Sequence, residues 1–363
     1  MIRAVIIGFA HMHVNEIAQY ILSQPDTGLV GIADTEPKLP ENTEKRYTRA
    51  WNLKNVAGLT NAKIFSDYKQ LLDETKPDFA YILCENFKKP EIALECAKRG
   101  VNVVVEKPMA ADLSGAELIA SLPEKYGVEV AVNWPVAWRP YLHRFKQAAD
   151  ERICGEPVRL RYLNGHTGPL GKGAKHRGVT ESADDMTDGE RSRIWWYNSD
   201  CGGGAFLDIL CYGCWFARWI FGVPLGVTAM GANLATPYAD CEDNTAALFR
   251  YDGKIAVAEG SWTIPRVIVP AGPQLLCTDG ALVCSGGADS GQRAEAYSLS
   301  GEPIELPEPE LPESMRNMPW HIAAHILDGK PLFEPLTAEF NLDVMRMLDA
   351  AVRSDAERRE VKP

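Results

Sequence analysis

The sequence predicts an α/β protein with a doubly wound parallel sheet first and an α+β domain with a large, mainly antiparallel sheet second. In the first third, short apolar runs alternate with helical periodicity, which is typical of parallel strands joined by crossover helices. After Pro157 the apolar runs are separated by turns such as Tyr251-Asp252-Gly253-Lys254, which is typical of hairpins. A length of 363 residues favours two domains. We place them at residues 1–125 and 126–363, and allow for C-terminal helices that pack back on the first domain.

Six apolar runs predict the strands of the first sheet. They are residues 4–7, 29–33, 62–65, 79–83, 101–105 and 128–132. Between the first two, Val14, Ile17, Ala18 and Ile21 recur at the spacing of one helix face. Strands and helices in this alternation predict a Rossmann domain, whose ligands bind at the carboxyl ends of the strands.

The turn after the first strand is a candidate dinucleotide phosphate site. The free N–H groups of a helix N-terminus attract anions, and the usual fingerprint there is G-x-G-x-x-G. Here residues 8–13 read GFAHMH, so the first glycine is kept and Ala10 is small. We assign Gly8, Phe9, Ala10, His11 and Met12 to cofactor binding. We predict no metal for the two histidines of this turn, because no acid or thiol set lies near them in sequence.

Asp34 ends the second predicted strand, 26 residues after Gly8. A carboxylate there can accept hydrogen bonds from the adenosine ribose hydroxyls and would repel a 2′-phosphate. The cofactor is therefore predicted to be NAD, with NADP disfavoured. The alternative is an aspartate that only caps a turn. Residues 84–89 follow the fourth strand and would lie over the cofactor, which adds Cys84 and Asn86 to the predicted contacts.

Two stretches carry the candidate chemistry. Residues 103–109 read VVVEKPM, so a buried strand would deliver Glu106 and Lys107 to the ligand crevice, and Pro108 keeps Lys107 out of helical geometry. Residues 200–222 hold three consecutive glycines and then an apolar helix whose only carboxylate is Asp208. Tyr212 lies four residues further on, on the same helix face. An acid in an apolar helix needs a partner or a task.

With these residues in place, the chain resembles the Gfo/Idh/MocA family of NAD(P)-dependent oxidoreductases. The marks are Glu-Lys-Pro after the fifth strand and GGG-x-x-x-D in the second domain, and the likeness extends over nearly the whole chain. The resemblance implies a Rossmann domain, a dimer-forming second domain and sugar-like or cyclitol substrates. It also implies that Lys107 and Asp208 are catalytic. Two departures stand out: Tyr212 occupies a position where many members carry histidine, and a Thr-Pro-Asn-x-x-His signature is reduced to Asn86 with Lys89 at the histidine position.

The expected reaction is hydride transfer between a nicotinamide cofactor and a secondary alcohol. Removing hydride requires a group that takes the hydroxyl proton, and Lys107, Asp208 and Tyr212 are the catalytic candidates. In this hypothesis Lys107, next to the cationic nicotinamide, loses its proton more easily and polarises or deprotonates the hydroxyl. Tyr212 relays the proton if Lys107 stabilises its phenolate, and Asp208 orients the substrate or holds the lysine. Two alternatives remain: an NAD-requiring glycosidase of the same fold, and a non-catalytic sugar or dinucleotide sensor.

Substrate contacts are predicted mainly from an insertion at residues 165–199, which is rich in glycine and charge and suggests a lid, a binding loop or disorder. Trp195 and Trp196 could stack on a sugar ring or belong to the core. His166, His176 and Arg177 could bind hydroxyls or a carboxylate, or form an exposed basic patch. Arg139 could face the cleft or hold the crossover between the domains.

The composition limits the partners. A net charge of −11 argues against nucleic acid and anionic membranes as partners. No apolar run is long enough to span a membrane. Nine scattered cysteines fit a reducing compartment, and the Cys211-x-x-Cys214 pair is interpreted as buried thiols. We therefore expect a cytoplasmic enzyme with a small carbohydrate-like substrate, assembled as a homodimer or homotetramer.

Overall fold

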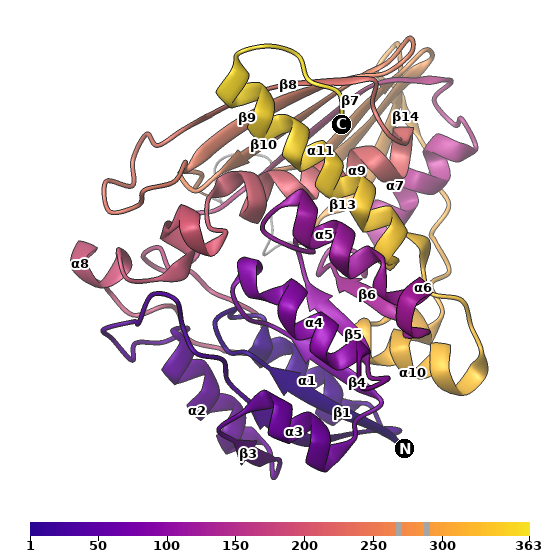
Figure 1. Cartoon of the computed structure of the whole chain (residues 1–363). Coiled ribbons are helices and arrows are strands. Elements are labelled where there is room, and N and C mark those ends of the chain that lie inside the picture. Colours follow the sequence, from indigo (N-terminus) through magenta and orange to yellow (C-terminus); the bar gives the residue numbers. More distant parts are fainter. Residues whose placement is uncertain (266–270, 287–290) are drawn as a thin grey trace.

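The computed structural model describes residues 1–265, 271–286 and 291–363. Figure 1 shows two layers of sheet, one at the bottom and one at the top, with helices between them and around the lower sheet. Strands of the lower sheet come from the N-terminal part of the chain, and those of the upper sheet come from the C-terminal part. The predicted fold class is confirmed.

The first sheet is parallel, with the strand order β3-β2-β1-β4-β5-β6. Its strands are β1 (Ile2–Ile7), β2 (Thr27–Ala33), β3 (Lys63–Phe65), β4 (Phe79–Ile82), β5 (Asn102–Glu106) and β6 (Val130–Asn133). The strand order reverses between β1 and β4, and this is where such sheets bind ligands. β6 pairs with β5, so the first sheet continues past residue 125.

Six helices accompany this sheet. They are α1 (Val14–Ser23), α2 (Arg49–Leu59), α3 (Tyr68–Thr75), α4 (Lys89–Ala97), α5 (Leu113–Ala120) and α6 (Leu122–Tyr126). α1 buries Val14, Ile17, Ala18 and Ile21, the face predicted from their spacing. α3 begins where the Asp67 side chain accepts a hydrogen bond from the Lys69 N–H group, which satisfies one free donor of the first turn. α2 was not predicted, because it buries the polar Arg49 and Asn52 and shows no apolar stripe.

The second sheet has the order β14-β13-β12-β11-β7-β10-β9-β8. Its strands are β7 (Pro157–Gly165), β8 (Gly226–Ala232), β9 (Asn244–Arg250), β10 (Ile255–Ser261), β11 (Gly272–Cys277), β12 (Gly280–Ser285), β13 (Arg293–Ser298) and β14 (Pro303–Ile304). Its pairs are antiparallel except β7 with β10. Three helices, α7 (Pro140–Asp150), α9 (Cys211–Phe221) and α11 (Ala338–Glu357), pack against it.

The C-terminal helices connect the two parts of the molecule. α11 packs against α5 and β6 as well as against β8, and α10 (Met318–Asp328) packs against α1. Thr337, which caps α11 by accepting a hydrogen bond from the Phe340 N–H group, also bridges to Ala131 of the first sheet. The predicted return of these helices to the first domain is therefore present.

Residues 165–199, which we call the closing segment, are ordered and lie against the first domain. The segment contains the short helix α8 (Asp188–Arg191), visible at the left of Figure 1. Arg46 pairs with Asp184 at 2.8 Å, the Tyr47 hydroxyl donates to the Glu181 carbonyl at 2.7 Å, and Lys45 pairs with Glu190 at 2.7 Å. The segment therefore links the two domains across the cofactor crevice.

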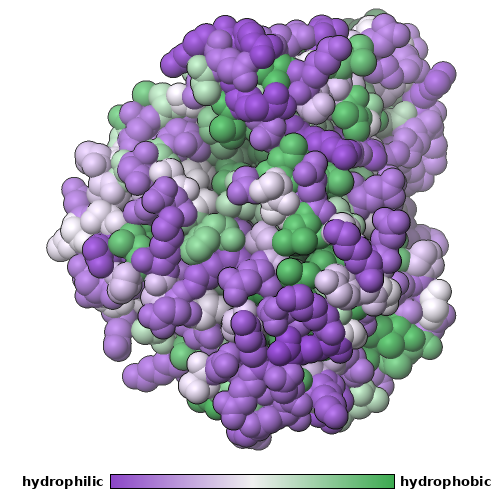
Figure 2. All heavy atoms as spheres, in the orientation of Figure 1, coloured by the Kyte–Doolittle hydropathy of each residue, from purple (hydrophilic) through white to green (hydrophobic). Residues whose placement is uncertain are grey.

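The described residues contain no helix that is both long and apolar enough to cross a membrane. On the face shown in Figure 2, small apolar groups are scattered among hydrophilic side chains. The nine cysteines are all free, and Cys211 and Cys214 are fully buried. The interpretation of this pair as buried thiols of an apolar helix is confirmed.

Candidate active site

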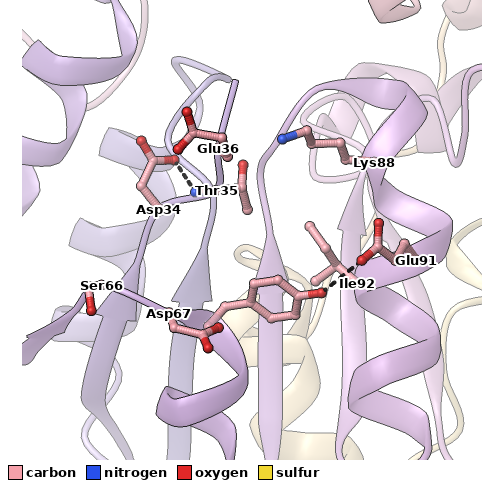
Figure 3. A pocket seen from close by; sticks show the side chains of 9 residues that line it. Asp34, Thr35, Glu36, Ser66, Asp67, Lys88, Glu91 and Ile92 are labelled. Carbon is pink, nitrogen blue, oxygen red and sulfur yellow. Dashed lines mark hydrogen bonds between the residues drawn. The ribbon is translucent and has the colours of Figure 1, made fainter. Parts of the chain in front are cut away.

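A cavity of about 350 Å³ opens beyond the carboxyl end of β2. Asp34 and Glu36 come from the loop after β2, and Lys88 and Glu91 come from the opposite side, where α4 begins (Figure 3). Asp67 and Ile92 complete its floor and wall. The cavity has a carboxylate where an adenosine ribose would bind and more acids than bases, so it fits NAD better than a nucleotide with a 2′-phosphate.

Asp34 is held in place by three donors on one oxygen. Its Oδ1 accepts hydrogen bonds from the Phe9 N–H group at 3.0 Å, the Thr35 N–H group at 2.8 Å and the Arg49 guanidinium at 2.5 Å. Arg49 also binds Glu85 at 2.5 Å, so a mostly buried arginine neutralises two acids. No described residue binds Asp34 Oδ2, which leaves that oxygen for a ligand. Arg49 was not predicted as a partner of Asp34, because it lies fifteen residues further along the chain.

Gly8 is the position where the backbone approaches another strand most closely in this turn. Its φ angle is +89°, and a Cβ atom there would lie 2.6 Å from the Cys84 backbone nitrogen. Glycine is required for both reasons. Cys84 is buried beneath this turn and lines neither the cavity at Asp34 nor the pocket described below, so the structure places it behind the cofactor crevice rather than in it.

Lys107 and Asp208 meet across the two domains, as the sequence predicts. The Lys107 Nζ atom donates hydrogen bonds to the Asp208 carbonyl at 2.8 Å and to its Oδ1 atom at 3.0 Å. Asp208 Oδ2 accepts from the Trp262 indole at 2.8 Å and lies 3.7 Å from His166 Nε2. Burial opposes the charge on both groups, but neighbouring groups outweigh it: Tyr212 and then Asp208 favour the charge on Lys107, and Lys107 and then His166 favour the charge on Asp208. The pKa of Lys107 is raised and the pKa of Asp208 is lowered.

The contact with Asp208 determines the charge on this lysine. The pKa of Lys107 is raised here, whereas the predicted loss of its proton concerns the complex with the nicotinamide cation. An ammonium group has three N–H donors, and Asp208 uses two of them. Lys107 is therefore arranged to donate a hydrogen bond to a ligand oxygen rather than to accept a proton from it.

Tyr212 lines the same pocket but presents its ring to Lys107. The Lys107 Nζ atom lies 4.6 Å from the centre of the Tyr212 ring, a cation–π geometry. Burial raises the pKa of the Tyr212 hydroxyl, although the nearby Lys107 charge opposes this rise. The proposed phenolate relay is thus disfavoured, and Tyr212 is placed to act as a neutral hydroxyl.

Lys89, at the position of the missing histidine, holds the Glu106–Pro108 turn. Its Nζ atom is fully buried and donates to the carbonyls of Glu106 at 2.5 Å and Pro108 at 2.8 Å, and to Asn86 Oδ1 at 2.7 Å. Burial lowers its pKa to about 8. The Asn86 amide in turn donates to the Gly202 carbonyl at 2.7 Å, so Asn86 connects the two domains.

A pocket of about 80 Å³ lies at the Lys107–Asp208 pair. It is lined by twelve residues: His11, Met12, His13, Lys107, Asn164, His166, Pro169, His176, Trp196, Asp208, Ile209 and Tyr212. Four of the seven histidines of the chain are among them. The pocket is strongly polar, and both domains contribute to it.

The other predicted substrate residues divide into two groups. His166, His176 and Trp196 line the pocket, so they can contact a ligand. Trp195 does not line it: its ring stacks on Trp196 with 3.8 Å between centroids, and its indole donates to the Ala10 carbonyl at 2.9 Å, which fits the core alternative. Arg177 pairs with Glu16 at 3.2 Å, and Arg139 lies at the start of α7, so neither lines the pocket.

His13 and its contact with Glu106 were missed. The reason given against a metal was the lack of a nearby acid, and that reason is wrong. Glu106, 93 residues away in sequence, lies 3.0 Å from His13 Nδ1 and 3.9 Å from His11 Nε2. Both carboxylate oxygens of Glu106 are occupied or shielded, because Oε2 accepts from the Asn133 amide at 2.7 Å and the side chain is fully buried. Glu106, predicted to bind the cofactor, is thus screened by His13.

Comparison with known proteins agrees with this site. Residues 2–134 match the family model described as oxidoreductase family, NAD-binding Rossmann fold, and residues 144–282 match the C-terminal domain model of the same family. The chain belongs to the Gfo/Idh/MocA family. Its N-terminal part is an NAD-binding Rossmann domain, and NAD is the cofactor of this family member. No curated protein matches the chain.

Solved structures share the fold of this Gfo/Idh/MocA protein over its whole length. An aldose-aldose oxidoreductase from Caulobacter crescentus, complexed with glycerol, has a TM-score of 0.76 and 17% identity, with coverage of 100% of this chain and 99% of the other. An oxidoreductase from Agrobacterium radiobacter in complex with NAD+, L-tartaric acid and magnesium has a TM-score of 0.73 and 17% identity, with coverage of 99% and 98%. GenD2 from gentamicin A biosynthesis, in complex with NAD, has a TM-score of 0.70 and 22% identity, with coverage of 100% and 96%.

Proposed function

We propose that this protein is an NAD-dependent dehydrogenase that transfers hydride between the cofactor and a secondary alcohol of a sugar, sugar acid or cyclitol. The observation that carries the proposal is the buried Lys107–Asp208 pair, which faces a small polar pocket shared with Tyr212. The names of the structural neighbours, which include an aldose oxidoreductase and complexes with glycerol and L-tartaric acid, support a polyhydroxylated substrate.

Each residue of the site has a separate role in cofactor selection or in the reaction. The carboxylate of Asp34 and the acids around it select an adenosine ribose without a 2′-phosphate. NAD, when bound, would supply the acceptor or donor of the hydride. Lys107, held in its charged form by Asp208, donates a hydrogen bond to the substrate oxygen and stabilises the negative charge that develops there. Trp262 and Asp208 fix the position of Lys107, and Tyr212 can donate a second hydrogen bond.

Screening NAD and NADP against sugars, sugar acids, inositols and glycosides tests this proposal. We expect absorbance of reduced nicotinamide to rise with at least one polyol or sugar, in proportion to product, and at least about tenfold higher kcat/KM with NAD than with NADP. A signal with NADP alone would contradict the assignment of Asp34. Cleavage of a glycoside without accumulation of NADH would replace the dehydrogenase with the NAD-requiring glycosidase.

We also propose that the protein pairs with a second copy through the open face of its second sheet. α7, α9 and α11 pack against this sheet, while Met230, Leu248 and Leu276 remain exposed by 63%, 52% and 45%. A groove of about 420 Å³ lies beside Met230 and is lined mainly by β8, β9 and β10. Light scattering should give a mass of at least two chains, and Leu248→Asp should reduce it to one. A monomeric wild-type protein would refute the pairing.

A further inference from the structure

The Glu106 carboxylate acts on the pocket through His13. Glu106 Oε1 lies 3.0 Å from His13 Nδ1, and Oε2 accepts from Asn133 at 2.7 Å. When the carboxylate accepts at both oxygens, the contact with Oε1 places a proton on His13 Nδ1. In neutral His13 the lone pair is then on Nε2. The His13 side chain is 16% exposed and lines the pocket, whereas Glu106 is fully buried.

In His11, which lies beside His13, the other ring nitrogen carries the proton. The His13 backbone N–H group donates to His11 Nδ1 at 3.2 Å, so the proton of neutral His11 is on Nε2. Burial and the positive charges nearby lower the pKa of His11, which keeps it neutral. Its Nε2 atom is buried and has no hydrogen-bond partner. Because that nitrogen carries hydrogen, it donates a hydrogen bond and does not offer a lone pair to a cation.

The two rings therefore form a complementary pair, with centroids 4.3 Å apart. His11 Nε2–H is a donor, and His13 Nε2 is an acceptor. A hydroxyl group is the simplest ligand that satisfies both, because its oxygen accepts while its hydrogen donates. Among the other candidate acceptors of the hydroxyl proton, Lys107 and Tyr212 have raised pKa values and hold their protons at neutral pH. Asp208 already accepts from Lys107 and Trp262, which leaves His166 as the main rival in the pocket.

We propose that His11 and His13 bind the reacting hydroxyl of the substrate, and that His13, oriented by Glu106 and Asn133, accepts its proton. This inference rests on the proposed dehydrogenase function. During oxidation the C–H bond breaks and its hydride leaves to NAD+, while the O–H bond breaks and its proton passes to His13 Nε2. The carbon that lost the hydride and the oxygen that lost the proton then form the carbonyl group. Lys107 donates a hydrogen bond to the carbonyl oxygen. His13 then releases the proton to solvent.

The groups that face His13 set the expected pH dependence. Glu106 and His11 lie beside it, and Lys107, Asp208, His166 and His176 face it across the pocket. Oxidation needs neutral His13, so kcat/KM for oxidation should fall on the acidic side. His13→Gln should lower kcat for oxidation by about 10²–10⁴-fold and remove that acidic limb, with the Kd for NAD within about threefold of wild type.

His13→Ala provides the decisive test, because added imidazole can replace a missing acid–base group but not a missing structural contact. We expect imidazole to raise kcat for oxidation in His13→Ala by at least about tenfold. His325→Gln, on α10 and outside the residues that line the pocket, should keep wild-type rates. His166→Ala tests the main rival, in which His166 accepts the proton. If imidazole rescues His166→Ala and not His13→Ala, the proposal is wrong. Loss of NAD affinity without loss of the acidic limb also overturns it, since His13 would then bind a cofactor hydroxyl.

The proton positions can be checked without any substrate. In the full-length protein labelled with ¹⁵N-histidine, the resonances that disappear in His13→Gln and His11→Gln should show neutral His13 protonated on Nδ1 and neutral His11 on Nε2. The reverse tautomers would refute the pair. If the wild-type protein oxidises no alcohol in the panel, the proposed function fails, and this measurement alone decides whether the pair presents one donor and one acceptor.

Discussion

Lys107→Met should lower kcat/KM for alcohol oxidation by at least about 10³-fold while NAD still binds. The variant removes the donor that stabilises the developing oxyanion, and single donors of this kind contribute about 10²–10³-fold to rate. It also removes the group that positions Asp208. Steady-state kinetics with the best substrate of the panel, together with calorimetric titration of NAD, gives both quantities. Activity within tenfold of wild type would remove Lys107 from the mechanism.

Folding must be separated from chemistry in this variant. Loss of one partner of a buried ion pair costs about 3–5 kcal/mol, because the remaining charge has no counter-charge. Lys107→Met alone would leave the Asp208 carboxylate in that state. The double variant Lys107→Met/Asp208→Asn removes both charges and should recover much of the free energy of unfolding without recovering activity. Lys98→Met, on the surface beside Glu95, should behave as wild type.

Gly8→Ala should lower the free energy of unfolding by about 4 kcal/mol. A non-glycine residue at positive φ costs about 1–2 kcal/mol. The new Cβ would in addition lie 2.6–2.8 Å from backbone and Cβ atoms of Cys84, which belong to the strand region beside it and cannot rotate away. Such overpacking adds about 1–3 kcal/mol. Urea denaturation followed by tryptophan fluorescence measures the change.

Gly100→Ala is the matched control. Its φ angle is +70°, similar to that of Gly8, but a Cβ there would have no atom within 4 Å. It should therefore show only the conformational cost, about 1 kcal/mol. Equal effects at the two positions would mean that the close approach to Cys84 contributes nothing.

The first domain could be predicted because its strands are buried on both faces and are therefore continuous apolar runs. α2 could not, because it is stabilised by polar contacts: the Asn52 amide, for example, donates to the Phe9 carbonyl at 3.0 Å. In the second domain β12 and β13 were missed. β13 alternates small and polar residues without a distinct apolar signal, whereas β12 reads GALVCS and holds only a short apolar run. Their pairing with each other and with β11 depends on the completed sheet.

The Lys107–Asp208 pair was predictable from two motifs, but its environment was not. Glu106 meets His13, and Asp34 meets Arg49, only after the chain folds, and no periodicity connects these positions. The protonation of Lys107 likewise depends on the 3.0 Å distance to Asp208. Residue type therefore indicated which groups take part, whereas hydrogen-bond geometry decides which of them holds a proton.

The Lys107–Asp208 contact joins the two domains. One partner belongs to the Rossmann sheet and the other to the helix region of the second domain, so separating the domains would also dismantle the reaction centre. A partly opened molecule would leave a buried cation and a buried anion without each other. For the proposed dehydrogenase, turnover and interdomain closure should therefore be lost together.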